Sequence, residues 1–245
     1  DDTILGGDGN DKIEGGMGHD LVGGQDGNDE IDGGAGTDSL FGSKGEDTVD
    51  GGAGADEVHG NQDDDVISGG AGDDEVSGGA GDDVVNGDAG NDLAYGGKDD
   101  DTVDGGDGDD LLRGDLEGGG ANPGDGDDII NGGAGNDTIG GQGGDDDIDG
   151  GIGNDRLFGS DGNDSILGGE GDDYIRGNKD DDELTGGAGA DTFSFVTNDG
   201  VDTITDFEDG VDLIDLSAFG LTPPALGASV TILAGTSETY DDGFG

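Results

Sequence analysis

The chain has 245 residues, a formal net charge of −57, 27% hydrophobic residues and no cysteine. So much charge with so little apolar surface is typical of chains that do not fold unaided, and it argues against nucleic acids and anionic membranes as partners. The absence of cysteine excludes disulfides and thiolate metal sites. The composition therefore indicates that the chain needs many cations to fold.

Residues 6–194 read as 21 consecutive nine-residue frames, the first of which is GGDGNDKIE. Glycine holds position one in 20 frames and position four in 17, aspartate holds position six in 20, and a large apolar residue holds position eight in 19. Glycine suits a backbone that must adopt positive φ and approach an ion closely. Positions seven and nine are mostly polar, so each frame predicts a six-residue turn and a three-residue strand with position eight in the core.

This pattern resembles the GGxGxDxUx nonapeptide of RTX, or hemolysin-type, calcium-binding repeat proteins. The resemblance implies an all-β fold, a right-handed parallel β-roll. In this β-solenoid two nonapeptides form each 18-residue coil, and a small C-terminal β cap closes the end. We therefore expect a calcium-binding roll over residues 1–194 and a capping, secretion-associated segment over residues 195–245.

Calcium takes about six to eight oxygen ligands, which is more than one turn supplies, so two stacked turns are needed for each ion. The resemblance assigns each ion to a pair such as Asp11 with Asp29 or Asp20 with Asp38, with glycine carbonyls completing the shell, for at most about 19 ions. Aspartates that only solvated the surface would repel one another at strand spacing. The expected carboxylate ligands are Asp11, Asp20, Asp29, Asp38, Asp47, Asp56, Asp65, Asp74, Asp83, Asp92, Asp101, Asp110, Asp128, Asp137, Asp146, Asp155, Asp164, Asp173, Asp182 and Asp191. The expected glycine ligands are Gly7, Gly9, Gly16, Gly18, Gly34 and Gly36.

Residues 114–122 (GDLEGGGAN) have the length of one frame without its chemistry, and they form either a bulged loop or a degenerate half-turn. If they form a half-turn, Leu93, Leu111 and Ile129 share position seven at steps of 18 and make an outward apolar stripe for a protein partner. Otherwise these residues are ordinary exposed aliphatics, or the loop covers them.

From residue 195 onward lysine and arginine disappear, and apolar residues alternate loosely with Asp and Thr. This pattern predicts two or three longer strands. Residues 202–220 (DTITDFEDGVDLIDLSAFG) resemble the segment that follows the repeats in serralysin-type proteins. There it caps the roll near a C-terminal secretion signal. The first residues already fall inside a frame, so we expect this chain to be a piece of a longer protein.

Other motifs are weak. Asp145, Asp147 and Asp149 have EF-hand spacing, but Arg156 stands at the twelfth position, where that loop needs Glu. His19 and His59 are 40 residues apart, which does not fit an 18-residue coil, so we expect surface histidines. The sequence contains no HExxH, GxSxG, GxGxxG or Walker motif and no transmembrane span or cleavable leader. We therefore expect a chain that is not itself an enzyme and does not insert into membranes.

The expected activity is calcium binding that drives folding. Extracellular calcium modules bind at about 10⁻⁴ to 10⁻³ M, so the chain is expected to be unfolded at cytosolic calcium and folded outside the cell. The resemblance implies export of the unfolded chain by type I secretion machinery and a secreted, extracellular or cell-surface location. Two fuller roles stay open: the C-terminal module of an exported hydrolase or epimerase, and the repeat section of an adhesin or surface-layer protein.

Overall fold

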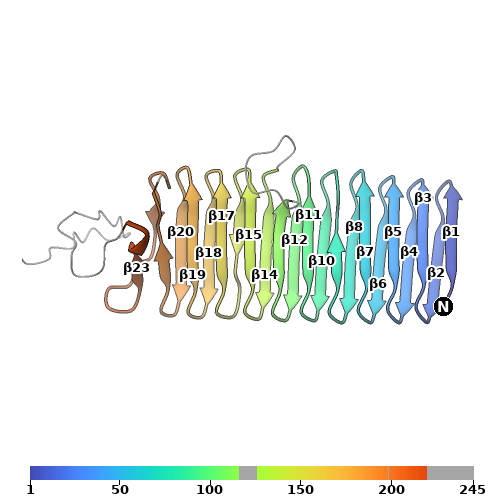
Figure 1. The fold of residues 1–245 in the computed structure, drawn as a ribbon, viewed down its shortest axis with the longest axis horizontal. Coiled ribbons are helices and arrows are strands. Elements are labelled where there is room, and N and C mark those ends of the chain that lie inside the picture. Colours follow the sequence, from blue (N-terminus) through green and yellow to red (C-terminus); the bar gives the residue numbers. More distant parts are fainter. Residues whose placement is uncertain (116–125, 198, 220–245) are drawn as a thin grey trace, which may run out of the picture.

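The computed structural model describes residues 1–115, 126–197 and 199–219, and it forms a parallel β-solenoid of about 11 turns (Figure 1). Each turn contributes one strand to each of two sheets. The odd-numbered strands form a 12-stranded sheet, which we call sheet A, and the even-numbered strands form an 11-stranded sheet, which we call sheet B. The all-β, parallel β-roll architecture predicted from the sequence is confirmed.

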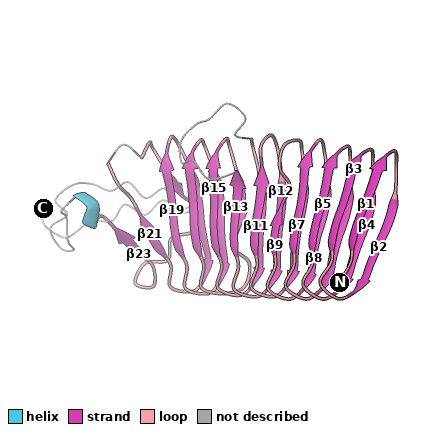
Figure 2. Cartoon of the chain, turned by 45° about the vertical axis from the view of Figure 1, so that its right-hand side comes forward, coloured by secondary structure: helices cyan, strands magenta, loops and turns pink. Residues whose placement is uncertain are grey.

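Sheet A contains β1 (Thr3–Asp8), β3 (Leu21–Asp26), β5 (Ser39–Lys44), β7 (Glu57–Gln62), β9 (Glu75–Ser77), β11 (Leu93–Gly97), β13 (Leu111–Asp115), β15 (Thr138–Gly143), β17 (Arg156–Asp161), β19 (Tyr174–Lys179), β21 (Thr192–Ser194) and β23 (Leu213–Asp215). Sheet B contains β2 (Lys12–Met17), β4 (Glu30–Ala35), β6 (Thr48–Ala53), β8 (Val66–Ala71), β10 (Val84–Ala89), β12 (Thr102–Asp107), β14 (Ile129–Ala134), β16 (Asp147–Asp149), β18 (Ser165–Glu170), β20 (Glu183–Ala188) and β22 (Thr203–Ile204). A 3₁₀ helix, η1 (Ser217–Phe219), follows β23 (Figure 2).

Most strands are longer than the three residues expected from the frame. Strand β4 pairs with β6 through Glu30↔Thr48, at position seven, and also through Gly34↔Gly52, in the glycine-rich part of the next frame. The glycine backbones of successive coils thus continue the ladder into what the sequence predicted to be turn. The three-residue estimate was wrong because it counted only the residues whose side chains alternate.

The core consists of the position-eight side chains, as predicted. Leu40, Ile139 and Leu157 are fully buried, and even Ala94, the small residue at this position, has no exposed surface. Burying one such Leu or Ile contributes roughly 1.5–3 kcal/mol, so a file of them running the length of the roll is the main apolar contribution to its stability.

Within the repeats, the step between paired residues changes at residues 114–122. Before this segment, strands pair with the residue 18 later, as in Leu93↔Leu111. Across it the step is 27, as in Leu111↔Thr138 on sheet A and Thr102↔Ile129 on sheet B. Strands β13 and β14 are therefore consecutive, and no strand of the described residues lies between them. Gly114 and Asp115 are described, whereas the rest of the segment lies outside the described residues.

This register makes the predicted apolar stripe wrong. Leu93 and Leu111 are neighbours on sheet A, but Ile129 lies on sheet B, next to Thr102. The stripe required an uninterrupted step of 18 residues, and the insertion moves Ile129 to the other sheet. No partner is proposed for these residues.

The two sheets continue past residue 194. Strand β22 pairs Ile204 with Leu184, and β23 pairs Ile214 with Phe193. These strands have two and three residues, so the prediction of longer strands is wrong for the described part of this segment. The extra strands place Ile204 and Ile214 against the core. Among the described residues, no helix has the length and apolar character needed to cross a membrane.

Candidate metal centre

The position-six aspartates lie in two columns, one along each edge of the roll where the chain passes from one sheet to the other. Column 1 precedes the strands of sheet A and contains Asp20, Asp38, Asp56, Asp74, Asp92, Asp110, Asp137, Asp155, Asp173 and Asp191. Column 2 precedes the strands of sheet B and contains Asp11, Asp29, Asp47, Asp65, Asp83, Asp101, Asp128, Asp146, Asp164 and Asp182. All of them are buried, with 0–4% of their surface exposed, except Asp11 in the first coil, which is half-buried.

One carboxylate oxygen of each position-six aspartate from Asp20 to Asp191 accepts a backbone N–H from the preceding coil. The backbone N–H of Asp29 donates to Oδ1 of Asp47 at 2.7 Å, and the same contact repeats along both columns. The ladder crosses the insertion without a gap, because the N–H of Asp101 donates to Oδ1 of Asp128 at 2.8 Å. Each column is thus a continuous file of carboxylates at strand spacing.

The second carboxylate oxygen, Oδ2, has no hydrogen-bond partner in nearly all of the position-six aspartates. Oδ2 is buried and unpartnered in each position-six aspartate from Asp11 to Asp182. A buried carboxylate oxygen without a partner is strongly unfavourable unless it faces a cation. The columns therefore present a file of oxygens that need positive charge.

A backbone carbonyl converges on the same place as the unpartnered oxygen. A Cβ added to Gly132, at position one, would lie 2.7 Å from Oδ2 of Asp137 and 2.4 Å from the carbonyl oxygen of Gly150 in the next coil. Carboxylate and carbonyl oxygens in a flexible arrangement are the donors that calcium prefers. The residues present therefore fit a calcium ion.

The six predicted glycine ligands all adopt positive φ in the turns: Gly7 (110°), Gly9 (113°), Gly16 (100°), Gly18 (129°), Gly34 (100°) and Gly36 (146°). A side chain is disfavoured there. The coils also stack closely, since a Cβ on Gly36 would lie only 1.4 Å from the carbonyl oxygen of Gly18. Their role as ligands belongs to the proposal below.

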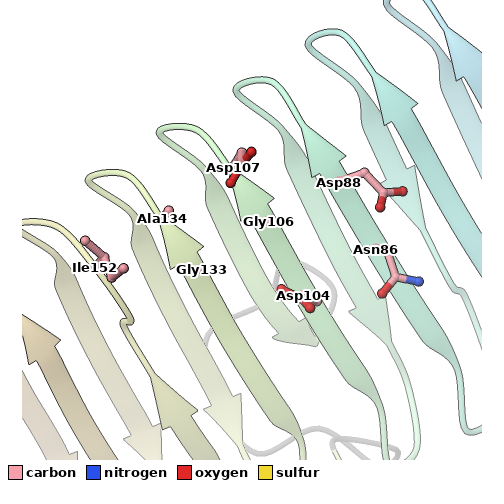
Figure 3. A pocket seen from close by; sticks show the side chains of 8 residues that line it. All are labelled: Asn86, Asp88, Asp104, Gly106, Asp107, Gly133, Ala134 and Ile152. Atoms are coloured by element: carbon pink, nitrogen blue, oxygen red, sulfur yellow. The ribbon is translucent and has the colours of Figure 1, made fainter.

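A shallow cavity of about 360 Å³ lies away from the aspartate columns, on the outer face of sheet B (Figure 3). Asp88, Asp104 and Asp107 point outward there, and no position-six aspartate lines it. In the described part of the chain, no group of three or more His, Cys, Asp or Glu residues is arranged to hold a metal. A cation in the columns would therefore take much of its shell from backbone carbonyls.

The comparison with known families decides the identity of the repeat. A family model described as RTX calcium-binding nonapeptide repeat (4 copies) matches residues 1–22, 23–58, 59–94, 86–117, 123–157 and 158–193. The chain belongs to the RTX calcium-binding repeat family. Its repeats are thus calcium-binding repeats, as the glycine and aspartate columns predicted. No curated protein matches the chain.

Burial raises the pKa of the position-six carboxylates from Asp47 to Asp191 above the ordinary value of 3.8. The pKa of Asp101 rises to about 9, chiefly because burial penalises the charged form, with further increases from the charges of its column neighbours. The same causes raise the pKa of Asp65 and Asp164 to about 8 and that of Asp137 to about 7. Protons and calcium are therefore alternative ways of neutralising the same oxygens.

Acid is accordingly expected to replace part of the calcium requirement. A carboxyl whose pKa is higher in the folded than in the unfolded chain stabilises the fold at low pH, and this contribution is lost as pH rises through the folded pKa values, here about 6 to 9. In chelator, lowering the pH from 8 to 5 should increase the β signal in circular dichroism. In saturating calcium the signal should stay flat over the same range. A chelated chain equally disordered at both pH values would contradict the raised pKa values.

Three residues extend the columns beyond the predicted set. At the start of the roll, the N–H of Asp2 donates to Oδ1 of Asp20. At the other end, the N–H of Asp182 donates to Oδ1 of Asp202 at 3.3 Å, and the N–H of Asp191 donates to Oδ1 of Asp212 at 3.1 Å. The signal for the last two was present as DGVDTI (199–204) and DGVDLI (209–214), each of which contains positions four to eight of a frame. A frame repeated every nine residues does not reach them, because these coils are two to three residues longer.

A second ladder, at position five, also went unpredicted. Oδ1 of Asn136 accepts the N–H of Asn154 at 2.9 Å, and Oδ1 of Asp109 accepts the N–H of Asn136 at 2.7 Å. In this exposed ladder the side chain of the earlier coil accepts, whereas at position six the side chain of the later coil accepts. The preference for Asp and Asn at position five was the available signal.

Proposed function

We propose that calcium ions bind between stacked turns of this roll, each held by a pair of successive position-six aspartates such as Asp11 with Asp29, or Asp20 with Asp38. Glycine carbonyls such as those of Gly7 and Gly9 would complete the shell. The observation that supports this proposal is the file of buried Oδ2 atoms without hydrogen-bond partners. Calcium supplies the positive charge that these oxygens need.

The number of ions follows from the number of turn pairs. With one ion between successive turns of each column, the ten aspartates of each column would hold about nine ions, or about 18 over residues 6–194. This is one fewer than the sequence estimate, because the step of 27 across residues 114–122 removes one turn. Residues 1–194 carry 54 acidic and 7 basic residues, which is a net charge of −47. About 18 ions would add a charge of about +36 and cancel most of it.

Calcium binding would then be the driving force of folding. Without calcium, a column of like charges at strand spacing repels itself, and each strand contributes only one buried position-eight side chain to the core, so the open chain is favoured. With calcium, the same carboxylates become ligands shared between coils. The chain would fold after export, at the roughly millimolar calcium outside the cell, as expected for a secreted or cell-surface protein delivered by type I secretion.

The roll is proposed as a module within a larger secreted protein. Residues 1–194 would form the calcium-binding part and residues 195–245 the capping, secretion-associated part, and neither part is proposed to be catalytic. The module serves either an exported hydrolase or epimerase, or an adhesin or surface-layer protein. The other domains of the full-length protein distinguish the two: a catalytic domain supports the first and further repeats support the second.

A calcium titration tests the proposal. Far-UV circular dichroism and hydrodynamic radius are followed from chelator to 10 mM calcium, with magnesium in parallel. We expect a cooperative gain of β structure with compaction, half-complete at about 10⁻⁴ to 10⁻³ M calcium. Magnesium should have little effect, because it demands octahedral geometry and gives up its water reluctantly. Full β structure in chelator would contradict the proposal.

A further inference from the structure

The turn between β13 and β14 contains the nine-residue insertion, yet it keeps both ends of a regular frame. A Cβ on Gly114 would lie 1.9 Å from Oδ2 of Asp128, in the way that a Cβ on Gly96 would lie 2.5 Å from Oδ2 of Asp101. Gly114 is thus position one of this turn and Asp128 is its position six. The insertion lies between Asp115, at position two, and Asp128, and it leaves the aspartate column intact.

Asp115 differs from every other residue with a side chain at position two in the described coils. It pairs with Gly97 in the neighbouring strand, only 2% of its surface is exposed, and its Oδ2 accepts the N–H of Gly143 at 3.2 Å. The other position-two residues with side chains are exposed or half-buried and have positive φ: Gln25, Ser43, Asn61, Asp88, Gln142, Ser160 and Asn178. At this one turn, position two therefore buries a carboxylate.

The Asp115 carboxylate lies beside column 2, because its Oδ2 accepts the N–H of Gly143 in the frame that contains Asp146. It is the strongest charged neighbour that raises the pKa of Asp146, and it also raises the pKa of Asp128 and Asp101. These three aspartates are 1–2% exposed, and each has an unpartnered Oδ2. Three successive turns of column 2 thus have four buried carboxylates here, whereas three successive turns elsewhere in the column have three.

We propose that the part of column 2 beside Asp115, from Asp101 to Asp146, holds the tightest calcium position of the roll and that calcium-driven folding starts there. The inference rests on the proposed function, namely that the aspartate columns bind calcium. Calcium affinity rises with the number of carboxylate charges at a site, and the attraction is strongest where the surroundings exclude water. Asp115 contributes through its charge, without needing to touch the ion. In a solenoid, coils ordered at one place provide the template on which their neighbours order.

Hydrogen exchange measured by mass spectrometry across a series of calcium concentrations tests the inference on the full chain. Peptides from residues 92–113 and 128–148 should become protected at about tenfold lower calcium than peptides from either end of the roll. The variant Asp115→Asn keeps an oxygen that accepts the Gly143 N–H but loses the charge. It should remove this advantage, so that the central peptides require as much calcium as the others.

Asp88→Asn is the matched control, because Asp88 also holds position two but is exposed and precedes a column 1 turn. It should leave the order of protection unchanged. Circular dichroism at saturating calcium should be the same for both variants and the original chain. Simultaneous protection of all coils, protection that starts at an end, or an unchanged order in Asp115→Asn would overturn the inference. Protection of every coil in chelator would instead overturn the proposed function.

Discussion

Replacing Gly153 with alanine is expected to cost about 3–5 kcal/mol of unfolding free energy in saturating calcium. Gly153 holds position four with φ of 150°, a conformation that side chains disfavour. A Cβ there would lie 1.4 Å from the carbonyl oxygen of Gly135 in the preceding coil. That oxygen belongs to the backbone of a stacked turn, so the coils must move apart to relieve the clash. Urea unfolding followed by circular dichroism measures the effect.

Gly9→Ala provides a matched control for this substitution. Gly9 also holds position four with positive φ (113°), but it lies in the first frame and a Cβ there would meet nothing within 4 Å. We expect this variant to cost only about 1–2 kcal/mol, from backbone strain alone. Equal costs for Gly9→Ala and Gly153→Ala would show that the stacking of the turns does not limit these glycines.

Replacing Asp137 with asparagine is expected to remove about two calcium ions and about 3 kcal/mol of stability in calcium at ten times the dissociation constant, since each such ion contributes about 1.4 kcal/mol. Asp137 has no exposed surface, its Oδ1 accepts the N–H of Asp110 at 2.8 Å, and its own N–H donates to Asp155. Asparagine preserves both hydrogen bonds and removes only the charge and the second carboxylate oxygen. The loss therefore reports on calcium and not on the ladder.

The control for this variant is Asp147→Asn. Asp147 is an exposed position-seven residue at the start of β16, and its substitution changes the net charge of the chain by the same amount. Calcium stoichiometry and the urea midpoint should match those of the original chain. If both variants lost stability equally, total charge would matter more than ligation in the columns.

The regular part of the roll was predictable because each position of the frame has one physical role. Position eight is apolar in nearly every frame, and its side chains fill the core. Position six is aspartate in nearly every frame, and its carboxylates lie in two files because alternate turns fall on opposite edges. Period, side-chain alternation and calcium chemistry are all readable from one sequence. The length of the strands could not be predicted from the sequence, because their extension through the glycines depends on backbone pairing between coils.

The irregular coils were harder to predict because one insertion changes which sheet a residue joins. Leu111 and Ile129 are 18 residues apart, as neighbours in a regular sheet are, yet they lie on different sheets. Whether nine extra residues form a strand or leave the roll depends on packing that the frame does not encode. In the same way, Asp202 and Asp212 continue the columns at irregular steps that a nine-residue frame does not follow.

The most direct test of the central claim is the number of calcium ions bound to the folded chain, counted by equilibrium dialysis at saturating calcium. The account predicts about 18 ions from residues 6–194, one for each pair of successive turns in the two columns. It also predicts that the count and the β signal fall together as chelator is added. A folded chain that binds only a few ions, or that keeps its β signal after all ions have been removed, would contradict the claim that the aspartate columns fold by binding calcium.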